Sequence, residues 1–306
     1  MDSQQLKAFL AVARHQSFSL AAEQLFLTQS AVSKRIQQLE QQLDSPLFER
    51  HNRSISLTES GQRLLPKARE ILELMNDTQI QISNLAGSVE GTLNIATSHH
   101  IGLHRIPPFL TSFVRQYPAV RLDIRFLGSE DAYQAVEQRR VELALTTLDE
   151  RQPDRVTAIP LWQDDMVCVC APGHPLACQQ QISLSSLAEN VAILPEPDTI
   201  TYRVVDAAFR DAGLTLETHM PTNYLETIKM MVSVGLGWSV LPSSMADDQL
   251  FVLPWPGAPM IRPLGVIHLA NRTLTNAASA FIALLSDSAT EPTNLIHDIV
   301  ATEGEA

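Results

Sequence analysis

Apolar residues recur every three or four positions through the first 43 residues, a pattern typical of amphipathic helices around a small core. The first helix carries an apolar stripe that includes Leu6 and Phe9. A second helix begins near Ser17 or Ser19, because either side chain can cap it. After a short break, a third helix is predicted over residues 29–43. The chain therefore begins with three short packed helices.

The third predicted helix has one buried and one exposed face. Its apolar stripe consists of Val32, Ile36, Leu39 and Leu43. The opposite face is polar and basic, and its candidate DNA-binding residues are Gln29, Ser30, Ser33, Lys34, Arg35 and Gln37. Amides and hydroxyls can read base edges, while Lys34 and Arg35 can meet phosphates. This pattern favours the recognition helix of a helix-turn-helix over its alternative, a merely solvated amphipathic helix.

Residues 46–58, PLFERHNRSISLT, predict a short hairpin with its turn at His51 and Asn52. Arg50 and Arg53 are expected at the tip, where they could contact phosphate or reach a minor groove. For either arginine the alternative is a solvated turn. With this wing, residues 1–60 are predicted to form an all-α winged helix-turn-helix.

A long linker helix, capped by Thr58, is predicted over residues 61–87 because its apolar residues alternate spacings of four and three. The positions of this seam are Leu64, Ala68, Ile71, Met75, Thr78, Ile82 and Leu85. A heptad seam without a partner in its own domain is best buried against the same helix of another chain, so we predict a dimer. The pairing should be weaker around the polar Thr78, and Gly87 should end the helix.

From Thr92 onward, strands alternate with helices, which predicts an α/β domain with a parallel sheet. The alternation continues through a second segment, so two lobes with a cleft between them are expected. The predicted boundaries are 91–290 for the domain, about 91–161 and 263–290 for lobe I, about 162–262 for lobe II, and 291–306 for a flexible tail.

The net charge and the distribution of charge along the chain give different indications about nucleic-acid binding. A net charge of −12 argues against a nucleic-acid partner for the chain as a whole, because cationic side chains drive phosphate binding. Residues 1–65, however, hold seven Lys or Arg against six acids, whereas the remainder holds 15 against 28. A near-neutral head can bind DNA if its basic groups share one surface. With neither a signal peptide nor a long apolar run in view, we expect a cytoplasmic protein without a membrane partner.

The segment 17–61 resembles the DNA-binding domain of LysR-type transcriptional regulators. The positions that carry the resemblance include Phe18, Ala21, Ala22, Leu25, the run Thr28-Gln29-Ser30-Ala31-Val32-Ser33, Ile36, Leu39, Glu40, Leu43, Leu47, Phe48, Arg50, Leu57, Thr58 and Gly61. Ser30 and Asp44 depart from it, since proline and glycine are frequent there in the family. Neither change removes a contact group, although the turn after Leu43 can differ. Less specifically, GHPLA at 173–177 and GLGWSVLP at 235–242 resemble the family's regulatory domain.

The resemblance implies a C-terminal α/β regulatory domain with a two-lobed, periplasmic-binding-protein-like (type 2) fold and a small-molecule effector between the lobes. It places effector contacts at the ends of the first-lobe strands and on the facing lobe. The corresponding residues are Ser98, His99, His100, Gly128, Ser129, Thr146, Thr147, Thr201, Tyr202 and Asn223. Backbone donors at helix starts and nearby hydroxyls favour an anionic effector. Arg105 and Arg203 could add a positive charge, but a structural or solvated role is preferred for both.

The resemblance further implies a homotetramer, built as a dimer of dimers, that binds double-stranded DNA at an inverted repeat and bends it. RNA polymerase is a further candidate partner. We expect closure of the lobes around the effector to rotate the linked dimers and so to change the DNA bend. A solute-binding receptor, the second hypothesis, would carry a signal peptide and no helix-turn-helix.

Two other sensing modes stay open. Of His99, His100 and His104, the last two are four residues apart and could share a helix face, but no carboxylate or cysteine stands nearby at ligand spacing. Effector contact or polar packing is therefore preferred, and no metal site is assigned. A pH-sensitive contact is the better role for these imidazoles.

The three cysteines, Cys168, Cys170 and Cys178, could form a redox switch, although strand cysteines are usually inert packing residues. They are too few and too clustered for a disulfide framework. The sequence contains no nucleophile elbow, phosphate loop or metalloprotease helix. We therefore expect neither an enzyme nor a cofactor.

Overall fold

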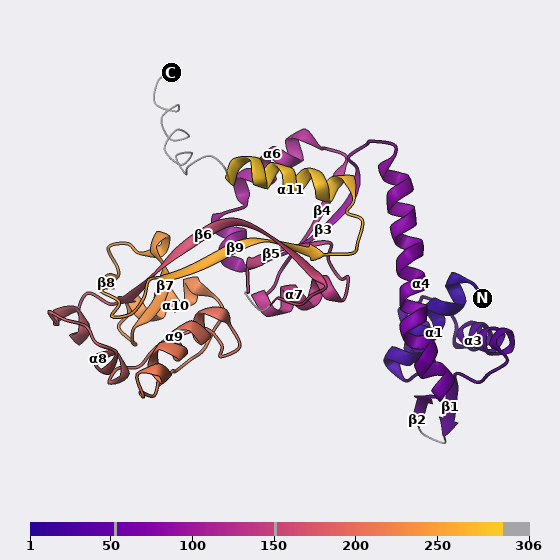
Figure 1. Cartoon of the computed structure of the whole chain (residues 1–306), viewed down its shortest axis with the longest axis horizontal. Coiled ribbons are helices and arrows are strands. Elements are labelled where there is room, and N and C mark those ends of the chain that lie inside the picture. Colours follow the sequence, from indigo (N-terminus) through magenta and orange to yellow (C-terminus); the bar gives the residue numbers. More distant parts are fainter. Residues whose placement is uncertain (52–53, 150–151, 290–306) are drawn as a thin grey trace. The chain divides into compact units, whose positions relative to one another are not determined.

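The computed structural model describes residues 1–51, 54–149 and 152–289. The chain divides into two compact units, Met1–Ala86 and a second unit that begins at Gly87 (Figure 1). The predicted tail at 291–306 lies outside the described residues. Across the described ranges, no helix is both long and apolar enough to cross a membrane.

The first unit contains three short helices, a hairpin and a long helix. They are α1 (Ser3–His15), α2 (Phe18–Gln24), α3 (Gln29–Leu43), β1 (Phe48–His51), β2 (Ser54–Leu57) and α4 (Glu59–Asn84). Side chains cap the helices: Ser17 Oγ, a predicted cap, accepts from Leu20 N at 3.3 Å, and Thr28 Oγ1 accepts from Ala31 N at 3.2 Å. These caps satisfy backbone N–H groups that have no partner inside their own helices.

The recognition helix α3 is anchored by its apolar stripe. Val32, Ile36 and Leu39 are fully buried, whereas Leu43 at the end of the helix is 40% exposed, so the predicted stripe is one residue shorter. Glu40 Oε1 accepts a hydrogen bond from Leu47 N at 2.8 Å and thereby ties α3 to the start of the hairpin. The helix and the wing are thus held in one core.

The hairpin pairs β1 with β2 antiparallel, from Phe48 opposite Leu57 to His51 opposite Ser54. Arg50 belongs to β1, as predicted for the wing. The other predicted tip residues, Asn52 and Arg53, lie outside the described residues.

The apolar seam of α4 packs partly within its own unit. Ala68 is fully buried in the core of the three short helices, and Leu64 and Ile71 pack against the same core. The premise that this whole seam lacks a partner in its own domain was therefore wrong for these three residues, because the first half of α4 covers the helix-turn-helix. Farther along, Met75 and Ile82 are 45% and 64% exposed.

The second unit is built on a seven-stranded mixed sheet in the order β4-β3-β5-β9-β6-β7, with β8 paired to β6. Its strands are β3 (Gly91–Thr97), β4 (Val120–Phe126), β5 (Leu143–Thr147), β6 (Val156–Cys170), β7 (Ser239–Pro242), β8 (Phe251–Leu253) and β9 (Met260–Leu269). Only β3, β4 and β5 run parallel, whereas β9, β6, β7 and β8 add antiparallel pairs. The prediction of a parallel sheet thus holds only for β3, β4 and β5 of the first lobe, since β9 pairs antiparallel with β5.

The long strands β6 and β9 run through both lobes (Figure 1). They pair antiparallel from Val156 opposite Leu269 to Met166 opposite Met260, with an irregularity between Pro160 and Trp162. The predicted lobe boundaries near residues 162 and 263 fall inside these two crossover strands. A continuous sheet therefore joins the lobes.

Helices cover both faces of the first lobe's sheet. They are α5 (His99–His104), α6 (Pro107–Gln116), α7 (Ser129–Glu137) and α11 (Asn276–Ala289). α6 and α11 lie together on one face, where the rings of Phe113 and Phe281 meet edge to face at 5.1 Å, and α7 lies on the other (Figure 1). Two apolar layers result, each rich in fully buried side chains.

The second lobe contains α8 (Leu184–Ala188), α9 (Ile200–Asp211), α10 (Leu225–Ser233) and the 3₁₀ turns η1 (Pro175–Cys178) and η2 (Ser243–Met245). Its core is centred on Trp238, whose ring stacks on Phe209 at 5.9 Å. The apolar run over 191–195 reads as a strand in the sequence but does not form one: Ala192 makes only isolated bridges to Thr218 and Trp238. A short apolar run of this kind is buried without joining a ladder, which periodicity alone cannot reveal.

Candidate functional site

The exposed face of α3 is the first candidate surface. Gln29, Ser30, Lys34 and Gln37 are exposed, as a base-reading helix requires. Ser33 and Arg35 are half-buried, and Arg35 Nη1 donates to Gln4 Oε1 at 3.2 Å. Arg35 is therefore partly engaged by α1, while Lys34 has no such contact within the described part of the chain.

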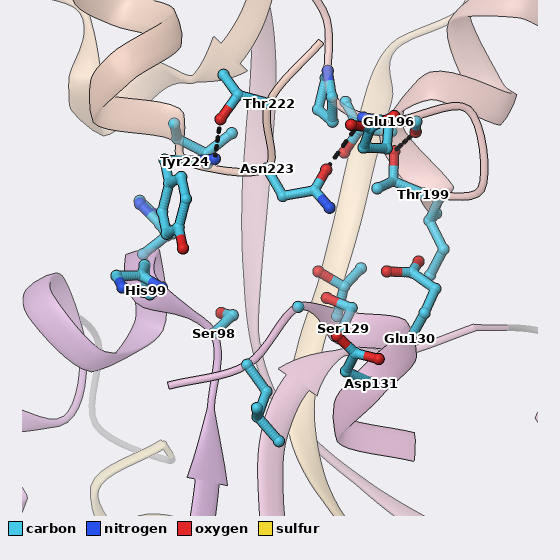
Figure 2. A pocket seen from close by; sticks show the side chains of 18 of the residues that line it. Ser98, His99, Ser129, Glu130, Asp131, Glu196, Thr199, Thr222, Asn223 and Tyr224 are labelled. Atoms are coloured by element: carbon cyan, nitrogen blue, oxygen red, sulfur yellow. Dashed lines mark hydrogen bonds between the residues drawn. The ribbon is translucent and has the colours of Figure 1, made fainter. Parts of the chain in front are cut away.

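The second candidate site is a cavity of about 360 Å³ within the second unit, lined by residues of both lobes. Figure 2 shows Ser98, Ser129 and Glu130 from the first lobe opposite Asn223 and Glu196 from the second. The first-lobe residues follow the ends of β3 and β4, where loops lead into α5 and α7. The second-lobe residues precede α9 and α10. A volume of this size suits a small metabolite.

Eight of the ten predicted effector-binding residues line this cavity: Ser98, His99, His100, Gly128, Ser129, Thr147, Thr201 and Asn223. Thr146 and Tyr202 do not. Successive strand residues point to opposite faces, so Thr146 is buried on the other side of β5 from Thr147. Tyr202 packs against the second lobe's core instead. In both cases an adjacent residue, Thr147 or Thr201, takes the cavity side instead.

Several lining residues were not predicted. They are Phe126, Leu127, Glu130, Asp131, Pro195, Glu196, Thr199, Ile200, Pro221, Thr222, Tyr224, Leu225 and Arg262. Three of them are carboxylates, which the prediction of an anion site did not anticipate. Most of the unpredicted lining residues are sequence neighbours of predicted ones such as Ser129 and Asn223. Including the two or three residues on either side of every predicted position would therefore have identified most of them.

Glu130 is the half-buried carboxylate of the three-residue run 129–131. Burial raises its pKa, and the negative charge of Asp198 acts in the same direction, while its own backbone N–H opposes both. The carboxyl group thus holds its proton more readily than an exposed glutamate does. In its protonated form it can donate a hydrogen bond toward a ligand, and in its ionised form it only accepts.

Asn223 is oriented by the second lobe. Its Oδ1 accepts a hydrogen bond from Glu196 N at 3.0 Å, which leaves the amide nitrogen for the cavity (Figure 2). A Cβ added to Gly128, on the first lobe, would lie 3.9 Å from that nitrogen, an ordinary van der Waals contact. The amide donor therefore lies close to the backbone of the first lobe.

Arg262 is the lining arginine, but a buried carboxylate engages it. Its Nη2 donates to Asp164 Oδ2 at 2.6 Å, and Arg105 Nη2 donates to Asp164 Oδ1 at 2.7 Å. Burial alone would raise the pKa of Asp164, yet the nearby His100 and the two guanidinium groups together hold it well below its usual range. Arg105 is thus structural, as preferred from the sequence.

Three contacts join the lobes beside the cavity. The rings of His99 and Tyr224 meet edge to face at 4.5 Å, and His104 Nε2 lies 2.9 Å from Glu226 Oε1. Arg203 donates to Asp149, so this second arginine also has a structural partner. The sequence could not reveal these pairs, because their members are 54 or more residues apart.

The cysteines do not form a reactive pair. Burial raises the pKa of the Cys170 thiol to about 11, and it raises that of Cys168 still further. All three cysteines are free thiols. A thiolate is the reactive species, so burial disfavours Cys168 and Cys170 as redox sensors, whereas Cys178 is exposed.

Comparisons with known proteins agree with this arrangement. A family model described as "Bacterial regulatory helix-turn-helix protein, lysR family" matches residues 3–62, and one described as "LysR substrate binding domain" matches residues 86–290. These two segments contain the α3 surface and the cavity, respectively.

Relatives match over nearly the whole chain. The RuBisCO operon transcriptional regulator of Allochromatium vinosum is 30% identical, with 90% of this chain and 93% of the relative covered. The HTH-type transcriptional regulator CfxR of Cupriavidus necator is 32% identical, with 94% and 92% covered. A solved full-length OxyR variant from Pseudomonas aeruginosa shares the fold with a TM-score of 0.63 at 24% identity, with 94% of each chain covered.

The site and the matches agree on one class of protein. The polar face of α3 belongs to a matched DNA-binding domain, and the cavity belongs to a matched effector-binding domain. The relatives that match over more than nine-tenths of their own length are named as regulators of transcription. This chain belongs to the LysR family of bacterial transcriptional regulators, in which a helix-turn-helix binds DNA and a separate domain binds a small-molecule effector.

Proposed function

We propose that the cavity between the lobes is the effector site of this regulator and that its occupancy controls DNA binding. The observation that carries the proposal is the convergence of both lobes on one polar cavity of about 360 Å³. A ligand that contacts both lobes favours their closed arrangement, since it binds that arrangement more tightly. Closure then changes how the linked dimers present their recognition helices to DNA.

The lining residues support an effector with two kinds of polar group. The hydroxyls of Ser98 and Ser129 and the amide of Asn223 offer hydrogen-bond donors to a carboxylate or another anionic group. Glu130 on the first lobe and Glu196 on the second offer acceptors to hydroxyl or ammonium groups (Figure 2). A ligand with several negative charges would face these carboxylates. We therefore propose a small carboxylate that also carries hydroxyl or amino groups.

The α3 surface supports reading of double-stranded DNA by Gln29, Ser30, Ser33 and Gln37, with phosphate contacts from Lys34. Arg35 contributes less, because Gln4 already engages it. Arg50 is proposed as a phosphate contact of the wing. The protein acts in the cytoplasm, where its DNA target lies.

The second half of α4 supports self-association. Met75, Ile82 and Leu85 remain exposed along the seam, and Leu85 is 86% exposed. Exposed apolar residues at heptad spacing favour pairing with the same helix of a second chain. We propose a dimer through this segment, a dimer of dimers on DNA, and contact with RNA polymerase once bound.

A thermal-shift screen of the full-length protein tests the effector proposal. The panel contains small hydroxy- and amino-carboxylates, phosphorylated metabolites and uncharged sugars. A carboxylate that binds the folded protein should raise its melting temperature. A shift with phosphorylated metabolites alone, or with uncharged sugars alone, would contradict the proposed chemistry of the site.

A further inference from the structure

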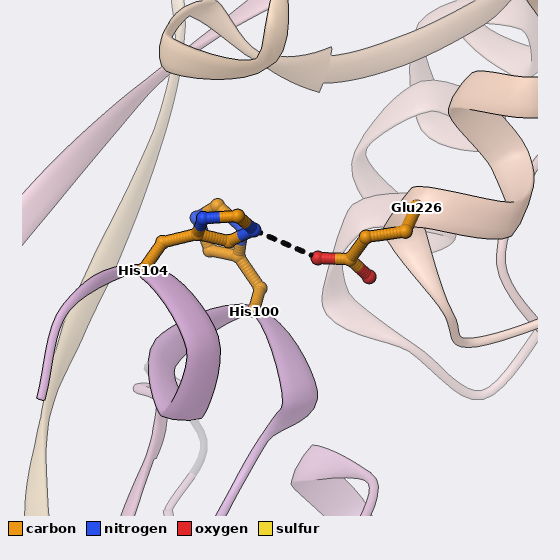
Figure 3. Close-up of side chains that lie close together, drawn as sticks. All are labelled: His100, His104 and Glu226. Carbon is orange, nitrogen blue, oxygen red and sulfur yellow. Dashed lines mark hydrogen bonds and ion pairs between the residues drawn. The ribbon is translucent and has the colours of Figure 1, made fainter. Parts of the chain in front are cut away.

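Two histidines and a glutamate meet where α5 of the first lobe faces α10 of the second. His100 and His104 lie one turn apart on α5, with ring centroids 5.2 Å apart. Glu226, in the first turn of α10, approaches them from the other lobe, and its Oε1 is 2.9 Å from His104 Nε2 (Figure 3). One potential ligand atom from each of the three residues lies within 4.8 Å of the other two.

His100 has the features of a buried metal ligand whose Nδ1 is left unpaired. Its side chain is only 4% exposed, and its Nδ1 has no hydrogen-bond partner among the described residues. Its Nε2 lies 3.3 Å from Asp164 Oδ2, without the alignment of a hydrogen bond. An unpaired buried ring nitrogen costs free energy, so a group that pairs with it would stabilise the fold.

The donor set identifies the kind of group that fits. Two imidazoles at positions i and i+4 of a helix and one carboxylate make a three-ligand set with an open fourth position, as zinc accepts. Asp164, beside His100, is the type of carboxylate that orients a metal-bound imidazole from outside the ligand set. We propose that His100, His104 and Glu226 bind a divalent transition-metal ion of the zinc type, which joins the two lobes.

The nearby charges narrow the choice of metal. Arg105 and Arg262 both engage Asp164, and with Glu226 these four side chains carry no net charge. Attraction between an ion and the site must therefore come from coordination by imidazole more than from surplus negative charge. Imidazole favours zinc, copper and nickel, whereas magnesium and calcium prefer oxygen ligands.

This inference goes beyond the effector cavity, although the two sites are adjacent. His100 lines the cavity, but His104 and Glu226 do not. A metal ion here would link α5 to α10 and so stabilise one arrangement of the lobes. Metal would then regulate the response to the effector without occupying the effector site.

Equilibrium dialysis of the full-length protein against Zn²⁺, with bound metal counted per chain, tests the site. We expect one tightly bound Zn²⁺, displacement by neither Mg²⁺ nor Ca²⁺, and a roughly tenfold or greater loss of affinity in both His104→Ala and Glu226→Gln. Both residues are partly exposed, so neither variant threatens folding. Zn²⁺ should also raise the melting temperature of the wild type and not that of the variants.

His219→Ala is the matched control, because His219 and Glu217 form an exposed pair at 3.1 Å without a third ligand among the residues that the structure describes. It should bind Zn²⁺ as the wild type does. Loss of binding in His219→Ala, unchanged binding in His104→Ala, or the absence of a tight site in the wild type would overturn the proposal. Because His104 and Glu226 lie outside the cavity, failure of the metal site leaves carboxylate binding by the wild type intact, and the two proposals are tested separately.

Discussion

Asp164 Oδ2 accepts a hydrogen bond from Arg262 Nη2 at 2.6 Å, and the two residues face each other in register on β6 and β9, where the chain crosses between the lobes. Asp164 is 2% exposed. Arg105 donates to the other carboxylate oxygen, so two cations share one buried anion. The guanidinium of Arg262 thus reaches the cavity wall with much of its charge already compensated, which explains why the site is polar without being strongly cationic.

Asp164→Asn should destabilise the second unit by about 3–5 kcal/mol, because removal of one partner leaves buried guanidinium groups uncompensated. The measurement is urea unfolding of the full-length protein, followed by a probe specific to the second unit. Asp165→Asn is the matched control: Asp165 is the exposed neighbour on the same strand and should change stability by less than about 0.5 kcal/mol. Equal losses in the two variants would contradict the structural role of the pair.

Acid should weaken the contribution of Asp164 to the stability of the second unit. The pKa of Asp164 is lowered in the folded protein, so its stabilisation is fully present above the unfolded-state value of about 3.9 and is lost as the pH falls through the lowered value. The difference in stability between the wild type and Asp164→Asn should therefore narrow in strong acid. A difference that stays constant down to the most acidic pH at which the protein folds would argue against this assignment.

Glu130→Gln should stabilise the protein at neutral pH. The folded-state pKa of Glu130 is raised, so the wild type is favoured below the ordinary value of about 4.3 and loses that advantage as the pH rises through the raised value. The melting temperature of the variant should exceed that of the wild type at about pH 8 and match it at about pH 4. Glu137→Gln, exposed on the same helix, should have little effect at either pH. A variant that is less stable than the wild type at neutral pH would contradict the account.

Gln29 and Lys34 should differ in how their loss affects DNA binding. Gln29→Ala should cost about 1–3 kcal/mol on the preferred site and relax the choice of base. Lys34→Ala should weaken binding to all sequences and reduce the salt slope by about one unit. Fluorescence anisotropy with specific and scrambled DNA at several salt concentrations measures both effects. An equal loss on both DNAs for Gln29→Ala would refute its role as a base contact.

Ile82→Asp should separate the proposed dimer, because it places a charge in the exposed half of the α4 seam. The dimer dissociation constant should rise roughly tenfold or more, which corresponds to about 1.4 kcal/mol. Sedimentation equilibrium measures this constant. Ser83→Asp adds the same charge at the adjacent exposed position outside the seam and should leave the dimer intact. If both variants dissociate alike, the seam is not the interface.

Local pattern and resemblance predicted the elements that depend on nearby residues. The helix predicted over 29–43 was confirmed to the residue, because its cap, its apolar stripe and its end are all local. Whether Ala68 packs in the core of its own unit or in a dimer interface was not predictable, because a heptad pattern does not reveal which partner covers an apolar residue. Similarly, Glu226 stands 122 residues after His104 and meets it only through the fold. Thr146 and Thr147 show a further difficulty in assigning site residues from sequence. Successive strand residues point to opposite faces of the sheet, so an assignment that is shifted by one residue falls on the face away from the cavity.

Binding of a small-molecule effector between the lobes is the central proposal for this regulator. Calorimetric titration of the full-length protein with the carboxylate that shifts its melting temperature tests it most directly, in wild type, Thr147→Val and Thr146→Val. Thr147 lines the cavity and its neighbour does not. We predict that Thr147→Val weakens binding roughly three- to tenfold, as the loss of a hydrogen bond worth about 0.5–1.5 kcal/mol implies, while Thr146→Val binds like the wild type. Equal affinity in all three proteins, or a loss confined to Thr146→Val, would contradict the claim.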